Sequence, residues 1–375
     1  MTRPPPTFLL RALVRTRALL ARLRARTLPV NAEILARTFS LIEARALGVA
    51  AELDLAEHLS GGPRSADELA AAVGADADAV ERLLALLAET GCFARGDGGT
   101  WRNNATSEAL RASHPDSMRS WARFFAGAAH NRIWSEAEHS VRTGDSAVAA
   151  ATGHEFFDWS ASVDPAAGAL FNGAMLEGSR YLAASFAAVV DLSGARVLAD
   201  IGGGTGRLLA TVLSSHADLR GILYDLPEVV AEPDAALDPL ADRVEVVAGS
   251  FFESVPPGAD RHVLVSVLHD WDDDRARQIL VHCREALAPG GRVLVVEQVL
   301  DTGRPALFER HTDLLMLVLT GAGRERTRAD FDALFASAGF RVVATSRLAT
   351  LQTVFQLTPG DCQGDTDVTQ SRPLD

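Results

Sequence analysis

From about residue 192 onward, the chain alternates short apolar runs with segments of helical periodicity. Helical segments separate the first six runs, and a short turn joins the last two. This alternation is typical of an α/β fold in which helices cover both faces of a doubly wound, mainly parallel sheet, and the closing hairpin predicts one antiparallel strand. The expected strands are residues 196–201, 221–225, 244–248, 262–268, 291–300, 341–345 and 353–357.

The preceding part, residues 31–180, has an almost wholly helical pattern. Ser65 and Glu68 are spaced as a capping box at the start of a short helix, and either Asp76 or Asp78 is expected to begin the next one. Three helices followed by a hairpin are the element order of a winged helix. The expected elements are helices at residues 44–59, 66–73 and 79–90 and a hairpin at residues 92–102.

A winged helix can bind DNA, so a DNA-binding regulator is one alternative. A helix that reads DNA needs Arg or Lys facing the phosphates and bases. The candidate reading helix, residues 76–84, carries three acidic residues and one Arg. Because these acids would be repelled by the duplex, we favour a packing or dimerisation module.

The 375 residues suggest two domains at roughly 150 residues each.

Composition excludes several further classes of protein. Totals of 36 basic and 49 acidic residues give a formal net charge of −13, which argues against general nucleic-acid binding. All basic residues are Arg, so there is no lysine for a Schiff base or a P-loop. No apolar run approaches the ~20 residues that a membrane helix needs.

Cysteine and histidine spacing gives no sign of a metal site. Cys92, Cys283 and Cys362 are far apart and do not form a CxxC pair, and the histidines lack the HExxH pattern. This usage fits a protein of the reducing cytoplasm without structural disulfides.

The two ends of the chain are expected to lie outside the folded domains. Residues 1–30 carry seven arginines and no acidic residue, and arginines interrupt every candidate apolar core of a signal peptide. Leucines at near-helical spacing predict a basic amphipathic arm, which either extends freely or packs on a partner subunit. Residues 361–375 are expected to be a flexible tail.

A glycine-rich segment follows the first expected strand, between Asp200 and Arg207. Glycines there let the backbone approach a ligand closely and turn tightly into the next helix. The dinucleotide fingerprint needs another glycine where Arg207 stands. Asp200 before the glycines, and Asp225 located 19 residues beyond Gly206, suit a ligand with an amino group and a ribose diol. The segment therefore favours S-adenosylmethionine over NAD.

Several motifs make the resemblance to a family specific. The segment from Asp200 to Gly206 resembles the D-x-G-x-G-x-G motif of class I methyltransferases. Residues 268–273 resemble the L-H-D-W-x-D signature of plant-type small-molecule O-methyltransferases and their bacterial natural-product relatives. Residues 323–327 and the pair Phe171-Asn172 with Met175 match the same family, and the resemblance covers roughly residues 40–358 in the family's order.

The resemblance implies an S-adenosylmethionine-dependent O-methyltransferase without a metal, which releases S-adenosylhomocysteine. Its acceptor is expected to be an aromatic hydroxyl of a polyketide or quinone-like intermediate. The family's domain plan implies a methyltransferase domain at residues 181–360. It also implies a helical dimerisation domain at residues 31–180, which interlocks two subunits and closes part of the acceptor pocket. Methylation of nitrogen or carbon on the same fold, or cofactor binding without methyl transfer, remains an alternative.

The chemistry needs a deprotonated acceptor held close to the methyl group. A phenol has a pKa of about 10, so a general base helps at neutral pH. His269 follows a strand at the edge where open sheets bind ligands, and the resemblance implies that it is this base, with Glu297 and Glu325 as its partners. A buried glutamate without such a role would be costly.

The remaining site residues are implied by the resemblance as well. The residues expected to contact the cofactor are Asp200, Gly202, Gly203, Gly204, Gly206, Asp225, Leu226, Ser250, Phe251 and Trp271. The expected walls of the acceptor pocket are Phe125, Trp159, Met175, Asp270 and Met316. Ser250 replaces a family carboxylate near the adenine, and Val265 replaces a frequent Lys, which puts the strength of cofactor binding in question.

Overall fold

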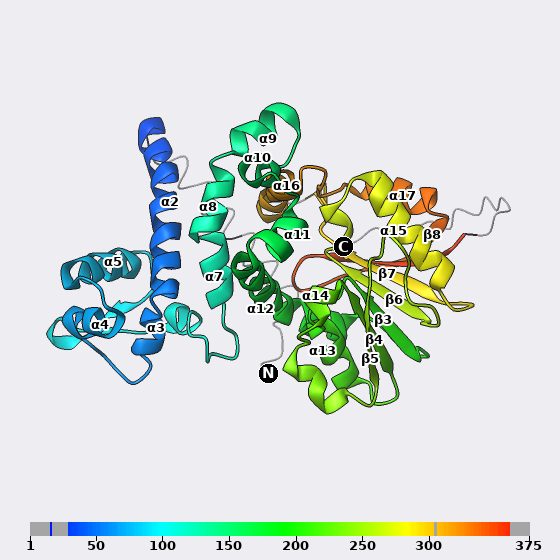
Figure 1. Ribbon diagram of the computed structural model, residues 1–375, viewed down its shortest axis with the longest axis horizontal. Coiled ribbons are helices and arrows are strands. Elements are labelled where there is room, and N and C mark those ends of the chain that lie inside the picture. Colours follow the sequence, from blue (N-terminus) through cyan, green and yellow to red (C-terminus); the bar gives the residue numbers. More distant parts are fainter. Residues whose placement is uncertain (1–15, 17–28, 304–305, 361–375) are drawn as a thin grey trace.

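The computed structural model describes residues 16, 29–303 and 306–360. Helices form the N-terminal part, and a seven-stranded sheet with helices on both faces forms the C-terminal part (Figure 1). The predictions for the basic arm and the tail fall on residues outside this description, apart from Thr16, Pro29 and Val30. None of the helices described is both long and apolar enough to cross a membrane.

The N-terminal part begins with four helices and a hairpin, because the first helix of the predicted winged-helix order is divided into α2 and α3. The Ser65–Glu68 capping box is present, and Asp76 is the residue that caps the next helix. The helix predicted at residues 44–59 is wrong in both bounds: the first helix already begins at Val30, and it ends at Glu52, shortly before Asp54, whose φ of 53° is left-handed. The elements are α2 (Val30–Glu52), α3 (Leu55–His58), α4 (Ala66–Val73), α5 (Ala77–Glu89), β1 (Ala94–Arg95) and β2 (Trp101–Arg102).

One acidic residue of α5 holds the hairpin. Glu81 accepts a hydrogen bond from Nε1 of the buried Trp101 at 2.7 Å and pairs with Arg95 at 2.7 Å. Arg82, the one basic residue of this helix, pairs with Asp78 at 3.8 Å on the surface. Glu81 thus serves packing within the domain.

A series of mostly short helices leads from the hairpin to the sheet. Glu177 on the last of them accepts hydrogen bonds from the backbone N–H groups of Ser120 and Trp121, which fixes α7 against α12. The boundary predicted between residues 180 and 181 lies inside α12, so one helix joins the two parts. The helices are α6 (Ala105–Glu108), α7 (Arg119–Phe125), α8 (Ala128–Trp134), α9 (Ala137–Thr143), α10 (Ala147–Thr152), α11 (Phe156–Asp158) with the π-helical turn η2 (Trp159–Val163), and α12 (Pro165–Val189).

The sheet has the predicted doubly wound topology, with strand order β5-β4-β3-β6-β7-β9-β8. Strand β9 pairs antiparallel with both β7 and β8, and the other pairings are parallel. The strands are β3 (Val197–Ile201), β4 (Arg220–Asp225), β5 (Val244–Ala248), β6 (Arg261–Val265), β7 (Arg292–Glu297), β8 (Phe340–Arg347) and β9 (Thr353–Pro359).

Two of the predicted strands were too long. The strand predicted at residues 262–268 ends at Val265, because Ser266 has a left-handed backbone (φ 52°) and residues 268–270 form the 3-10 turn η4 (Leu268–Asp270). The strand predicted at residues 291–300 ends at Glu297. Both strands therefore stop early at the edge where the candidate site residues lie.

Each face of the sheet has its own hydrophobic core. Helices α15 (Asp273–Ala286) and α17 (Arg328–Ser337) pack on one face. Helix α13 (Arg207–Ser215), the short η3 (Ala235–Leu240) and the C-terminal end of α12 pack on the other. Helix α14 (Pro227–Val230) follows β4, and α16 (Leu307–Thr320) contacts both α8 and η4, so it links the helical part to the sheet edge (Figure 1).

Candidate functional site

The glycine segment turns sharply from β3 into α13. Gly202 and Gly204 have left-handed backbones with φ of 68° and 59°, and a Cβ at Gly203 would lie 2.7 Å from Cγ of Asp200. Side chains are therefore excluded on steric grounds, and the backbone stays open to a ligand. The N–H of Gly204 donates to Asp225 at 2.8 Å, so the loop and the end of β4 are joined.

The two aspartates expected beside the cofactor lie at the ends of neighbouring strands. Burial, together with the charge of Asp225, raises the pKa of Asp200 to about 7, and burial also raises the pKa of Asp225. Oδ2 of Asp200 is buried and has no hydrogen-bond partner among the residues described. Oδ1 of Asp225 accepts from the N–H of Leu226 at 2.7 Å. An orphaned carboxylate oxygen of this kind suits a cationic amino group.

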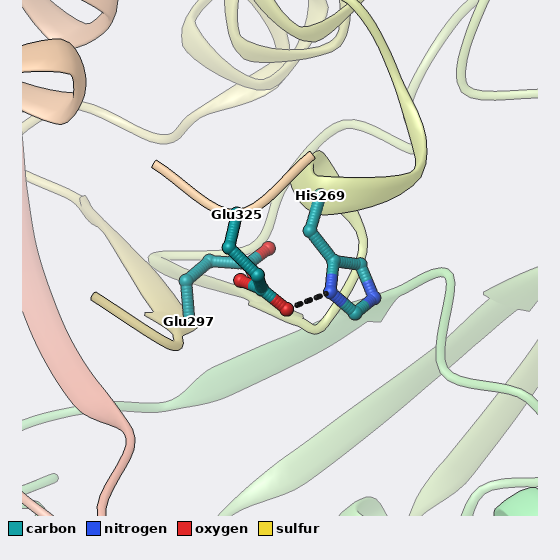
Figure 2. Close-up of side chains that lie close together, drawn as sticks. All are labelled: His269, Glu297 and Glu325. Atoms are coloured by element: carbon teal, nitrogen blue, oxygen red, sulfur yellow. Dashed lines mark hydrogen bonds and ion pairs between the residues drawn. The ribbon is translucent and has the colours of Figure 1, made fainter. Parts of the chain in front are cut away.

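The candidate base lies in η4, beyond the end of β6. Nδ1 of His269 lies 3.0 Å from Oε1 of Glu325, whose side chain is fully buried. Figure 2 shows Glu325 facing Nδ1, with the carboxyl group of Glu297 beside it and Nε2 turned away. Because the Glu325 carboxylate accepts a hydrogen bond from Nδ1–H, Nε2 is the nitrogen that can take a proton from another group.

Glu297 acts on the backbone of the same turn. Its Oε1 accepts hydrogen bonds from the N–H groups of Val267 at 3.1 Å and Leu268 at 2.8 Å. The left-handed backbone of Ser266 precedes this pair of N–H groups. Glu325 therefore orients the imidazole directly, whereas Glu297 holds the turn that carries it.

Carboxylates dominate the electrostatics of the site. Burial by itself would lower the pKa of the His269 imidazole. The carboxylates of Asp270, Glu297 and Glu325 outweigh burial and raise that pKa to about 10. Burial raises the pKa of Asp270 to about 6 and that of Glu297 to about 7, although each is also attracted to the imidazole. The surrounding carboxylates thus favour the protonated form of the His269 imidazole.

One nitrogen of His269 and one oxygen each of Glu297 and Glu325 lie within 4.8 Å of one another. Nδ1 contacts Oε1 of Glu325, and Oε1 of Glu297 accepts from the backbone. Oε2 of Glu297 and Oε2 of Glu325 are buried without a hydrogen-bond partner among the residues described. Orientation of the imidazole accounts for the contact between Nδ1 and Glu325.

Aromatic residues close the site beside η4. The Trp271 ring packs edge-on against Phe252 at 4.7 Å and stacks with Phe157 of α11 at 5.6 Å. Phe251 meets Trp271 edge-on, and its carbonyl accepts a hydrogen bond from Nδ1 of His282. Ser250 accepts from the N–H of Phe252 at 3.3 Å, so it shapes the turn after β5. These contacts place the expected cofactor wall against the helical part.

The residues expected to line the acceptor pocket come from different helices. Phe125, Trp159 and Met175 belong to one aromatic cluster, in which Trp159 is almost fully buried and the other two are half-buried. Met316 is buried on α16, the helix that contacts η4. Asp270 lies on the open side of the base, with Oδ1 located 3.7 Å from Nε2 of His269.

Two buried polar residues near the site were missed from the sequence. Arg326, in the motif at residues 323–327, is completely buried behind η4. His130 on α8 is buried in the aromatic cluster, where its Nε2 accepts a hydrogen bond from Trp134. Burial lowers the pKa of His130 to about 4, so it is neutral. The signal for Arg326 was its place beside Glu325, whereas no sequence signal marked His130.

Comparison with known proteins identifies the family to which the chain is similar. Residues 134–341 match the family model of the O-methyltransferase domain, and residues 36–113 match that of the O-methyltransferase dimerisation domain. The mitomycin biosynthesis 6-O-methyltransferase of Streptomyces lavendulae is 43% identical over 303 residues, which cover 80% of this chain and 86% of that protein. The phenazine O-methyltransferase PhzM of Lysobacter antibioticus is 36% identical over 328 residues, which cover 86% and 95%.

Solved structures share the whole architecture. The mitomycin 7-O-methyltransferase MmcR superposes with a TM-score of 0.82 at 39% identity, covering 91% of this chain and all of that one. The O-methyltransferase NcsB1 from neocarzinostatin biosynthesis, in complex with S-adenosylmethionine and 2-hydroxy-5-methyl naphthoic acid, has a TM-score of 0.70 at 35% identity. The superposition covers 84% of this chain and 95% of NcsB1. The open glycine turn and the orphaned oxygen of Asp200 fit the same cofactor.

Proposed function

Since the chain belongs to the O-methyltransferase family and is an S-adenosylmethionine-dependent enzyme, we propose that its acceptor is an aromatic hydroxyl of a polyketide or quinone-like intermediate. In this proposal, His269 deprotonates that hydroxyl. When bound, the cofactor supplies a methyl group on a cationic sulfur. The observation that carries the role of the base is the 3.0 Å contact between Nδ1 and Glu325, which leaves Nε2 as the nitrogen that can face the acceptor, with Asp270 located 3.7 Å away.

The residues of this chain bring the base and the acceptor into position. Glu325 fixes the tautomer and direction of the imidazole, and Glu297 holds the turn beneath it. Nε2 receives the hydroxyl proton once the imidazole is neutral, and the resulting imidazolium is stabilised by the surrounding carboxylates. The pKa of about 10 means that this neutral form becomes more abundant as the pH rises.

The acceptor class rests on the aromatic cluster and on the nature of the relatives. Phe125 and Met175 offer half-buried apolar surface, and Trp271 offers a ring at the border of the two parts. Flat aromatic rings bind such surfaces by stacking and edge contacts. Asp270 beside Nε2 adds one polar group that can accept a hydrogen bond from a second hydroxyl.

The working unit in this proposal is a homodimer. The N-terminal half of α2 extends beyond its neighbours and exposes a run of large apolar side chains that a monomer would leave in water (Figure 1). They are Val30, Ile34, Leu35, Phe39, Leu41 and Ile42. A two-fold interface is the common way to cover such a surface, and the match to the dimerisation domain supports it. Light scattering is expected to give about twice the 39.9 kDa chain mass.

Cytoplasmic location completes the proposal. Among the residues described, Cys92 and Cys283 are free buried thiols, and burial raises the pKa of Cys92 to about 11 and that of Cys283 to about 12. Such thiols are inert packing residues in a reducing compartment.

The direct test uses two aromatic probes with S-adenosylmethionine, followed by mass spectrometry and NMR of the product. 1,4-Dihydroxy-2-naphthoic acid offers hydroxyls, and 3-amino-4-hydroxybenzoic acid offers a hydroxyl and an amine on one ring. We expect a methoxy product from at least one of them. An N-methyl or C-methyl product would assign the alternative chemistry, and cofactor binding without any product would indicate a member that transfers no methyl group.

Two controls sharpen this test. His269→Ala is expected to abolish most of the turnover. His311 is an exposed histidine on α16, and His311→Ala should leave the turnover unchanged. A mobility shift with duplex DNA, performed beside the assay, would favour the regulator hypothesis if the protein retarded DNA and formed no product.

A further inference from the structure

Arg326 is a buried charge that the mechanism above does not use. It directly follows Glu325, and its side chain is 0% exposed. Nη1 donates to the carbonyl of Leu268 at 2.7 Å, and Nη2 donates to the carbonyl of Trp271 at 2.8 Å. The guanidinium therefore binds the two backbone carbonyls on either side of His269 and Asp270.

The same short segment holds the turn at further points. The N–H of Arg324 donates to the carbonyl of His269 at 2.7 Å, and Nε of Arg326 donates to Asp273, the first residue of α15, at 2.9 Å. The segment itself is fixed, because the N–H of Leu300 donates to the carbonyl of Arg326 at 3.0 Å. Residues 324–326 thus hydrogen-bond to the turn at residues 268–271, and Glu325 of the same segment contacts the imidazole of His269.

The geometry needs a planar fork. A guanidinium offers five donors in a fixed plane, so it can bind two carbonyls and a carboxylate at once, whereas an ammonium is a compact point charge. Hydrogen bonds to an ionised donor are roughly twice as strong as neutral ones. Because the charge is buried, leaving either carbonyl unpaired would be costly as well.

We propose that Arg326 is a positioning residue of the methyl-transfer reaction: its guanidinium holds the turn at residues 268–271 so that Nδ1 of His269 stays on Glu325 and Nε2 keeps its direction. The bond to the Trp271 carbonyl closes this turn at its C-terminal end. The catalytic consequence rests on the proposed function, but the positioning itself can be measured without any acceptor.

The first experiment follows the titration of His269 by NMR in the full-length protein labelled with ¹³Cε1-histidine. The signal is assigned by its loss in His269→Ala. Arg326→Lys keeps the positive charge but removes the planar guanidinium. A changed titration midpoint of His269 would therefore report a change in geometry. The ionisable groups around the imidazole are Asp270, Glu297 and Glu325, with Asp313 accepting from the Glu325 N–H. Loss of the Glu325 contact should lower the titration midpoint by about one pH unit or more.

Arg324→Lys is the matched control. Arg324 pairs with the same Asp273 at 3.2 Å, but its side chain is half-exposed and does not reach the turn. Its substitution should leave the titration of His269 unchanged. If Arg326→Lys fails to fold, Asp273→Asn weakens the contacts of Nε and Nη2 with Asp273 but leaves both carbonyl bonds, so it should shift the titration in the same direction by less. An unchanged titration in whichever Arg326 or Asp273 variant folds would overturn the inference.

The second experiment separates positioning from general stability. Arg326→Lys should lower kcat about 10–100-fold, because small misplacements of catalytic groups carry large costs, with little change in KM for S-adenosylmethionine. In the His269→Ala background the same substitution should lower kcat less than about twofold, since residues that act as a unit are not additive. An equal loss in both backgrounds would mean that Arg326 is merely structural.

The two proposals fail in different ways. A wild-type protein that methylates neither probe, while Arg326→Lys still shifts the His269 titration, would contradict the proposed function and support the positioning role. A wild-type protein that methylates a probe, with Arg326→Lys as active as the wild type and His269 titrating normally, would overturn the positioning role alone.

Discussion

The two halves of this molecule hold their candidate site residues in different ways. At the sheet edge, backbone groups fix the side chains: Asp225 accepts from the N–H of Gly204, and Glu297 accepts from the N–H of Leu268. In the helical half, Phe125 and Met175 pack among other side chains in one aromatic cluster. The first arrangement is set by strand ends, and the second by how separate helices pack.

This difference predicts which changes alter which step. A site anchored to backbone tolerates little displacement, so its substitutions should affect chemistry and cofactor binding. A cluster of side chains can repack, so its substitutions should affect mainly the acceptor. The comparison would be wrong if substitutions in the aromatic cluster altered cofactor binding, or if substitutions at the sheet edge altered only the binding of the acceptor.

The largest expected effect is on the chemical step. His269→Ala should lower kcat by about 10²–10⁴ while the protein stays folded, because the general base is lost. Phe125→Ala, in the helical half, should raise KM for the acceptor with little change in kcat. Steady-state kinetics with thermal melting as the folding control tests both. A His269→Ala enzyme with near-normal turnover at pH 7 would mean that the acceptor arrives ionised, as a carboxylate does.

Substitution of the two glutamates beside the base should lower kcat less than substitution of the base itself. Glu325→Gln and Glu297→Gln each remove an orienting group and leave the proton acceptor in place, so each should lower kcat less than His269→Ala. The losses should not add in double variants, since these residues act as a unit. Additive losses would indicate independent roles.

The next effect is a pH dependence of the free enzyme. The carboxylates raise the pKa of His269 to about 10, so the neutral base is a small fraction at pH 7. As pH rises toward that pKa the fraction grows, and kcat/KM for the acceptor should increase about tenfold per pH unit before it levels off. In Glu325→Gln, one raising charge is lost and the rise should move to lower pH. A flat profile between pH 7 and 9 would contradict a protonated base in the free enzyme.

Cofactor binding should depend on the sheet half alone. Asp225→Ala should weaken S-adenosylmethionine binding by about 1.5–3 kcal/mol, because charge-assisted hydrogen bonds to the ribose are lost. Met175→Ala, in the aromatic cluster, should leave the affinity unchanged. Isothermal calorimetry distinguishes these outcomes. An unchanged affinity in Asp225→Ala would remove the ribose role, and tight NAD binding would point to a dehydrogenase.

The smallest effect is local to the helical half. Ser65→Ala removes one side of the capping box of α4 and should lower the free energy of unfolding by about 1 kcal/mol. Affinity for the cofactor should not change, since α4 lies far along the chain from the glycine turn. Thermal denaturation beside calorimetry checks this. A parallel loss of cofactor affinity would show that the two halves are energetically coupled through α12.

Local patterns account for what could be predicted. The Ser65–Glu68 box, the cap at Asp76 and the glycine turn each depend on residues a few positions apart, so their outcome is visible in the sequence. Bounds failed where the backbone is unusual: Asp54 breaks the first helix, and Ser266 ends β6 early. Both have left-handed φ without being glycine, a conformation that propensity does not anticipate.

The sequence by itself determined the alternating sheet, the glycine turn after β3 and the location of His269 shortly beyond a strand end, because periodicity and motif spacing are local properties. Only the tertiary structure decided that Glu325 orients the imidazole while Glu297 holds its turn, that His130 is buried among aromatic rings, and that Arg326 grips two carbonyls. These relations join residues that lie far apart in the chain. Their energies depend on burial and on fixed distances, which exist only once the strands and helices have packed.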